Sequence, residues 1–291
     1  MALLHICVLV FVHFAAAVVL PLASSSQTLH PRLYFSRTDL PFLQKKAQRP
    51  FYVKILQQYT DALNHQLNYS AGGVLSTIDQ CAGCGWRHQL ATTLYLANGP
   101  NASFYGDMAK QDILKQAIAL TPATGNWFAG SERNLEQLIG SYDVLANLFT
   151  ATETAAIESS FALNANYMYA APPNGLGIPS DMASRLMNPA ADRACALGLI
   201  ALTMPHHSNA SIWLSQATQE FKWMLTNGVM SDGAWHEPST RYHGRVLAAF
   251  VPFAYALREA GEMDPFIDNN ERYSHNFKKF LGWYRLVSFH F

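Results

Sequence analysis

The chain has 291 residues, a formal net charge of zero, 50% hydrophobic residues and 14% charged residues. This composition is typical of a protein that buries a sizeable core, and it excludes an intrinsically disordered chain. The length allows one large domain or two small ones, and the absence of a basic excess gives a nucleic-acid partner no electrostatic support.

The N-terminal stretch MALLHICVLVFVHFAAAVVLPLASSSQ is apolar and then becomes small and polar. This pattern indicates a secretory signal peptide, assigned to residues 1–25, with cleavage between Ala23 and Ser26. The stretch has no Lys or Arg ahead of its apolar run, so an uncleaved membrane anchor is the alternative. The mature chain, residues 26–291, is expected to be secreted and to have no membrane contact after cleavage.

Three N-x-S sequons, at Asn68, Asn101 and Asn209, fall where loops are expected. They are candidate glycosylation sites and are consistent with secretion.

The mature chain keeps three cysteines, because Cys7 leaves with the signal peptide. Cys81 and Cys84 form a CAGC segment that fits a redox pair, half of a zinc site, a tight disulfide or simple thiols. No second pair of cysteines completes a four-cysteine zinc site. Cys195 lies in an apolar segment and is predicted to be a buried small residue.

Helical signals begin near Ser36 or Thr38, either of which can cap a first helix. A second helix is predicted after Pro50, with Ile55, Tyr59 and Leu63 on one face. Later helices are predicted over residues 85–99, 103–120, 134–149, 152–169, 191–204 and 211–229.

The predicted fold class is all-α, because no convincing strand or hairpin signal is present. Some helices are apolar on one side, whereas residues 191–204 are apolar nearly all round, as a helix buried on every side must be. This mixture predicts two layers of helices, an (α/α) toroid of antiparallel helix pairs over residues 26–291. The final run NFKKFLGWYRLVSFHF begins as a helix and ends without a cap, so we expect a chain truncated at its C-terminus.

Residues 231–247, SDGAWHEPSTRYHGRVL, gather acids, bases and aromatic side chains in a chain with few charges elsewhere. Tyr242 and His243 are expected where a loop broken by Gly and Pro meets a helix that begins near Arg245. Loops that end on rigid helices commonly carry functional residues. Tyr and His can both transfer protons, and a neighbouring Arg favours the ionised phenol.

The same segment contains groups that suit a sugar ligand. Trp235 offers a flat apolar face to a sugar ring, and Glu237 can accept a hydrogen bond or pair with an Arg. The alternative is a solvated loop in which Asp232 and Glu237 are turn and cap residues and Tyr242 packs into the core.

Three segments, in this order, resemble the heparinase II/III and alginate lyase superfamily. HPRLYFSRTDLPFLQKKA is similar to the start of its helical domains, and LEQLIGSYDVLANLFTATETAAI to a Tyr-Asp helix followed by a Thr-capped one. DGAWHEPSTRYHGRVLAAFVPFAYALREAG resembles the segment that precedes an inner helix. The resemblance runs, with gaps, from His30 to Gly261.

The resemblance implies an incomplete (α/α) toroid, usually followed by a β-sandwich, that cleaves uronic-acid polysaccharides by β-elimination. Tyr242 matches the family tyrosine, and Asn188 matches an asparagine whose side chain binds the substrate carboxylate. The alternative for Asn188 is a helix cap with Pro189 at the first helical position. Many relatives have His where this chain has Pro189, so Arg185 or Arg193 is a candidate substitute.

The expected partner is therefore an acidic polysaccharide. The candidate catalytic residues are Tyr242, His243 and His236. The candidate substrate-binding residues are Asn188, Arg185, Arg193, Trp235, Glu237, Arg241 and Arg245.

Two other functions compete with the lyase. A glycoside hydrolase would need two carboxylates across a cleft, for which Asp143 with Asp232 or Glu237 is the candidate pair. A non-catalytic carbohydrate-binding relative is the third possibility. No cofactor is expected, and no spaced His, Cys or Asp cluster requires a metal.

Overall fold

The structure, a computed structural model, describes residues 30–71, 86–120, 131–170, 185–237, 240–268 and 271–288. These residues form α-helices and short 3-10 turns, with one isolated bridge between Val229 and Trp235 and no strand, which confirms the all-α class. The predicted signal peptide and the CAGC segment lie outside the described residues. Within the described part of the chain, every helix is too short or too polar to span a membrane.

The chain divides into two compact units. Unit 1 comprises Met1–Thr121 and Gln137–Ser160, and unit 2 comprises Pro122–Glu136 and Phe161–Phe291. Helices α6 (Ser131–Leu145) and α7 (Ala151–Ala170) each contribute to both units.

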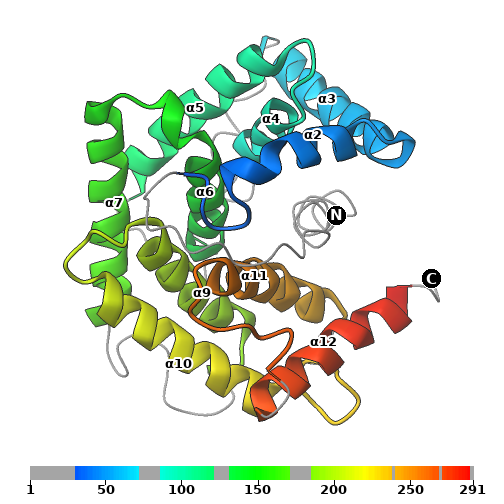
Figure 1. Ribbon diagram of the computed structural model, residues 1–291, viewed down its shortest axis with the longest axis vertical. Coiled ribbons are helices and arrows are strands. Elements are labelled where there is room, and N and C mark those ends of the chain that lie inside the picture. Colours follow the sequence, from blue (N-terminus) through cyan, green and yellow to red (C-terminus); the bar gives the residue numbers. More distant parts are fainter. Residues whose placement is uncertain are drawn as a thin grey trace. The chain divides into compact units, whose positions relative to one another are not determined.

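Besides its parts of α6 and α7, unit 1 contains α2 (Leu40–Ala47), α3 (Pro50–Ala71), α4 (Trp86–Leu96) and α5 (Ala102–Ala119). Consecutive helices pack against one another, α3 on α4 and α4 on α5 (Figure 1). Ile55, Tyr59 and Leu63 of α3 are buried, as their spacing predicts. Asn98 adopts a left-handed conformation with φ 54° just after α4, which confirms the predicted Asn-Gly stop.

Unit 2 is arranged around α9 (Asn188–Thr203), which is buried at every position. This confirms the prediction for residues 191–204, including the buried Cys195. Helices α10 (Ala210–Gly228) and α11 (Thr240–Glu259) pack on α9, and α12 (Arg272–Ser288) packs on α10 and α11 (Figure 1). Phe221 of α10 meets Phe250, Phe253 and Phe277 edge to face, which is the preferred geometry of aromatic pairs.

The helix boundaries show how α7 is capped and where the three sequons lie. The Thr150 side chain accepts a hydrogen bond from the Glu153 backbone, and Glu153 accepts one from Thr150, so these residues form a capping box for α7. Asn101 and Asn209 are the N-cap residues of α5 and α10, consistent with the predicted loops. Asn68 lies inside α3, so the loop predicted there is wrong.

The start of α11 also differs from the prediction. The helix begins at Thr240, more than one turn before Arg245, so Tyr242 and His243 belong to the helix and not to a loop. Gly244, which suggested loop punctuation, is buried inside the helix. Pro252 is likewise accommodated within α11.

Candidate functional site

Glu237 is bound to the N-terminal end of α9 in unit 2. One carboxylate oxygen accepts a hydrogen bond from the Asn188 backbone N–H at 2.8 Å and from Trp235 Nε1 at 3.3 Å. The Asn188 side-chain Nδ2 donates to the other oxygen at 3.1 Å. A carboxylate at a helix N-terminus satisfies open backbone donors and is favoured by the helix dipole. Glu237, and not the Asn188 side chain, therefore caps this helix.

Asn188 is consequently held in one orientation. It is the first residue of α9, after Met187 as N-cap, and Pro189 follows it. Its side chain is 4% exposed, and its Oδ1 is buried without a hydrogen-bond partner. Such an atom lacks the hydrogen bond that most buried polar groups make.

Helices α9 and α11 run parallel, with their N-terminal ends at the same end of the pair. Arg245 Nη2 of α11 contacts Asp192 Oδ2 of α9 at 3.1 Å. Further along both helices, the ring of Phe253 on α11 lies over Gly198 of α9. Two contacts in the same order along both helices fix the direction of the pair.

This arrangement brings Tyr242 and Asn188 to a common end of unit 2. Asn188 precedes Asp192 by one turn of α9, and Tyr242 precedes Arg245 by about one turn of α11, so each pair shares a helix face. Tyr242 is 39% exposed and thus accessible to a ligand.

His243 is a structural residue and does not suit the catalytic role predicted for it. It is 1% exposed, its Nδ1 accepts a hydrogen bond from the Trp235 backbone at 3.1 Å, and its Nε2 donates to the Phe280 carbonyl at 3.2 Å. The ring lies against Phe280 and Trp283, with centroids 4.2 and 4.4 Å away. Burial lowers the pKa of His243 to about 4. With both ring nitrogens occupied, the imidazole has no atom left to take a proton from a substrate.

Trp235 is 2% exposed, and its ring packs edge to face on Phe250 and Phe280. A Cβ built on Gly228 would lie 2.6 Å from the same ring, so the indole fills the space over this glycine. The predicted stacking of Trp235 on a sugar is therefore wrong, because neither face of the ring is accessible. Its role is to donate Nε1–H to Glu237.

Arg185 and Arg193 are the predicted substitutes for the family histidine that Pro189 replaces, and both are engaged or buried within the fold. Arg185 donates through Nε and Nη2 to both oxygens of Glu220, at 2.9 and 2.6 Å, and its guanidinium lies 3.6 Å from the centroid of Trp223. Arg193 is 2% exposed within α9. Neither guanidinium is therefore free for the substrate role that the sequence predicts.

Two predicted residues, His236 and Arg241, remain. His236 is exposed, and its backbone N–H donates a hydrogen bond to the Gly228 carbonyl at 2.9 Å. The side chain of Arg241 lies outside the described residues. Within the described ranges, no group of three or more His, Cys, Asp or Glu side chains could hold a metal ion.

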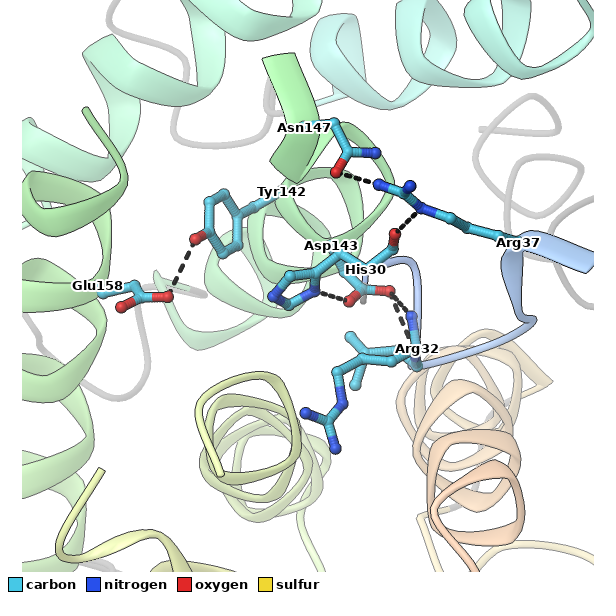
Figure 2. Close-up of polar contacts among 8 residues, drawn as sticks. His30, Arg32, Arg37, Tyr142, Asp143, Asn147 and Glu158 are labelled. Atoms are coloured by element: carbon cyan, nitrogen blue, oxygen red, sulfur yellow. Dashed lines mark hydrogen bonds and ion pairs between the residues drawn. The ribbon is translucent and has the colours of Figure 1, made fainter. Parts of the chain in front are cut away.

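In unit 1, Asp143 anchors the N-terminal segment to α6 (Figure 2). Its Oδ1 contacts His30 Nδ1 at 2.6 Å, and its Oδ2 accepts the backbone N–H groups of Arg32 and Leu33 at 2.9 and 3.0 Å. The Asp143 side chain is completely buried. Because the side chain is buried and both of its oxygens accept hydrogen bonds within the fold, Asp143 is not accessible to a ligand, which removes it from the carboxylate pair of a glycoside hydrolase.

Sequence reasoning missed this anchor, although it singled out both segments that form it.

Next to Asp143, Tyr142 donates its hydroxyl to Glu158 at 3.1 Å. Burial raises the pKa of Tyr142, and the Glu158 carboxylate raises it further. The phenol therefore stays protonated, so Tyr142 is a hydrogen-bond donor within unit 1 and not a proton acceptor.

His88 gives unit 1 a dependence on pH that can be measured. The side chain is fully buried, and burial lowers its pKa from 6.5 to about 4. The unfolded chain takes up a proton near pH 6.5 and the folded chain only near pH 4, so the free energy of unfolding should fall by about 3 kcal/mol across this interval. Urea unfolding at several pH values should show that the free energy of unfolding falls less in His88→Gln than in the wild type. His206→Gln, an exposed control, should show the same fall as the wild type. Equal losses in all three proteins would contradict the assignment.

No protein-family model matches the sequence, and no curated protein matches it. The likeness to the heparinase II/III and alginate lyase superfamily therefore depends on its three motifs. The function has to be argued from the residues that meet at the N-terminal ends of α9 and α11.

Proposed function

We propose that this chain is a secreted polysaccharide lyase that cleaves uronic-acid-containing glycans by β-elimination. The catalytic centre is the group formed by Asn188, Glu237, Tyr242 and Arg245. The observation that supports the proposal most directly is the parallel α9–α11 pair, which brings the two residues carried over from the family resemblance to one end of unit 2. The helices are then part of an incomplete (α/α) toroid.

The reaction requires an acid and a base on one sugar residue. The C5–H bond next to the carboxylate breaks, a C4–C5 double bond forms, and the bond from C4 to the glycosidic oxygen breaks. A proton then has to reach that oxygen. Tyr242 is suited to donate it, because its side chain is accessible and lies near the N-terminal end of α11.

The carboxylate of the sugar must also be neutralised as negative charge develops on it. The Arg245 side chain is partly exposed, and its hydrogen bond to Asp192 uses Nη2 and leaves Nη1 for a ligand. It lies about one turn from Tyr242, which suits a residue that binds the carboxylate of the sugar that Tyr242 protonates. The Asn188 amide is buried and donates to both oxygens of Glu237, so it fixes the N-terminal end of α9 and does not itself bind the carboxylate of the sugar.

Glu237 serves the site by holding Asn188. Its carboxylate accepts from the Asn188 backbone, the Asn188 amide and Trp235, so its negative charge is spread over fixed donors. The base that removes the C5 proton is then His236, the exposed histidine of this segment, or Tyr242 itself. His243 is excluded by its buried contacts.

The test is a product assay on alginate, hyaluronan, chondroitin sulfate and heparin. A lyase produces an unsaturated uronate that absorbs ultraviolet light, whereas a hydrolase releases new reducing ends without that absorbance. We expect absorbance to increase with at least one of these polymers. Reducing ends without absorbance would replace the lyase with a hydrolase, and no product from any polymer would favour a binding protein.

A further inference from the structure

The segment from His30 to Arg37 is held on α6 and on the short 3-10 helix that follows it, Ala146–Leu148, by hydrogen bonds at both of its ends. Asp143 binds the His30 side chain and the backbone of Arg32 and Leu33. Arg37 donates to the His30 carbonyl at 2.8 Å and to the side chain of Asn147, one turn after Asp143 (Figure 2). The backbone of Arg32 is thereby fixed, although its side chain makes none of these contacts.

The Arg32 guanidinium points away from the Asp143 carboxylate (Figure 2). Among the described residues, no acceptor forms a hydrogen bond or ion pair with it. The side chain is only half-buried, yet burial lowers its pKa, and the charge of Asp143 offsets this effect in part. Arg32 is therefore a partly desolvated cation whose guanidinium has no acceptor among the described residues.

We propose that Arg32 is an oxyanion-binding residue that takes the carboxylate or sulfate group of an acidic ligand. A guanidinium presents its N–H groups as a planar fork that fits such a group with two parallel hydrogen bonds. A rigid backbone limits the entropy lost on binding, because the side chain starts from a fixed point. The choice of a uronic acid as the natural ligand depends on the proposed function, whereas the oxyanion chemistry does not.

A structural role for Arg32 makes the opposite prediction about stability. A cation that stabilises the fold needs a partner, and removing such a cation destabilises the protein. A cation kept for a ligand lowers the stability of the protein while the ligand is absent. Replacing that cation therefore leaves the unliganded protein as stable as before or more stable. The stability of unliganded Arg32→Gln therefore distinguishes a structural role of Arg32 from a ligand-binding role.

The experiment titrates the full chain with sodium sulfate, sodium glucuronate and neutral glucose at constant ionic strength, by calorimetry and thermal melting. Monosaccharides have no glycosidic bond to cleave, so the result does not depend on lyase activity. We expect sulfate or glucuronate to bind the wild-type protein and to raise its melting temperature, while glucose does neither. Arg32→Gln should weaken anion binding by about tenfold or more, the effect of one lost charged fork.

Arg49→Gln is the matched control, because it removes the same charge from an exposed position in unit 1. It should bind both anions as the wild type does. The proposal is overturned if neither anion binds the wild type, if Arg32→Gln binds as well as Arg49→Gln, or if Arg32→Gln melts well below the wild type without ligand. A response to sulfate alone would identify a sulfated ligand, and a response to glucuronate alone an unsulfated uronic acid.

Discussion

Tyr242→Phe should reduce turnover of the cleaved polymer by about 10²- to 10⁴-fold, the usual contribution of a positioned proton donor. The substitution removes the phenolic oxygen and keeps the ring. The side chain is 39% exposed, and no group among the described residues hydrogen-bonds its hydroxyl, so the fold should not change. Because the lost interaction forms only in the transition state, kcat and kcat/KM should fall together.

Tyr167→Phe is the matched control for this result. Tyr167 is a 43% exposed tyrosine on α7 in the same unit, so it loses an equivalent hydroxyl away from the α9–α11 pair. Its kinetics and its thermal melting should equal those of the wild type. If Tyr242→Phe retains its activity, or if both variants lose activity equally, Tyr242 is not the proton donor.

Asp143→Ala should lower the free energy of unfolding by about 3 to 5 kcal/mol, the range seen when one partner of a buried polar pair is removed. The substitution leaves the His30 ring and the backbone N–H groups of Arg32 and Leu33 without their acceptor. Buried donors without an acceptor carry their full desolvation cost. Urea unfolding followed by circular dichroism measures the change.

Asp107→Ala serves as the comparison for Asp143→Ala. Asp107 is an exposed carboxylate on α5 in the same unit, and surface changes of this kind alter stability by less than about 0.5 kcal/mol. A similar small change for Asp143→Ala would mean that the N-terminal segment is held by other contacts. That outcome would also remove the rigid base on which the role of Arg32 depends.

Helices were the part of this molecule that the sequence could predict. The spacing of Ile55, Tyr59 and Leu63 and the apolar run of residues 191–204 follow directly from the helical repeat, and both are buried as expected. The start of α11 was misjudged because Gly and Pro weaken helices on average, whereas Gly244 lies buried inside this one. Local propensity does not include the neighbours that compensate for it.

The candidate site was harder to predict, because its residues are defined by distant partners. Trp235 and His243 have side chains suited to chemistry, but Phe250 and Phe280 enclose them, and no local pattern announces such packing. Glu237 was expected to be a turn, cap or ligand residue, yet the helix that it caps begins 49 positions earlier in the chain. The anchor of Asp143 likewise joins segments separated by more than 100 positions.

The glycine under Phe253 has a consequence for the distance between Asn188 and Tyr242. A Cβ at Gly198 would lie 2.3 Å from the Phe253 ring, so any side chain there would push α9 and α11 apart. Gly198 lies about 15 Å along α9 from Asn188, and Phe253 lies about as far along α11 from Tyr242. Asn188 and Tyr242 lie near the N-terminal ends of the same two helices, so the close approach at Gly198 limits how far apart those ends can lie. The spacing of the two helices therefore depends on a residue without a side chain, at a position remote from both Asn188 and Tyr242.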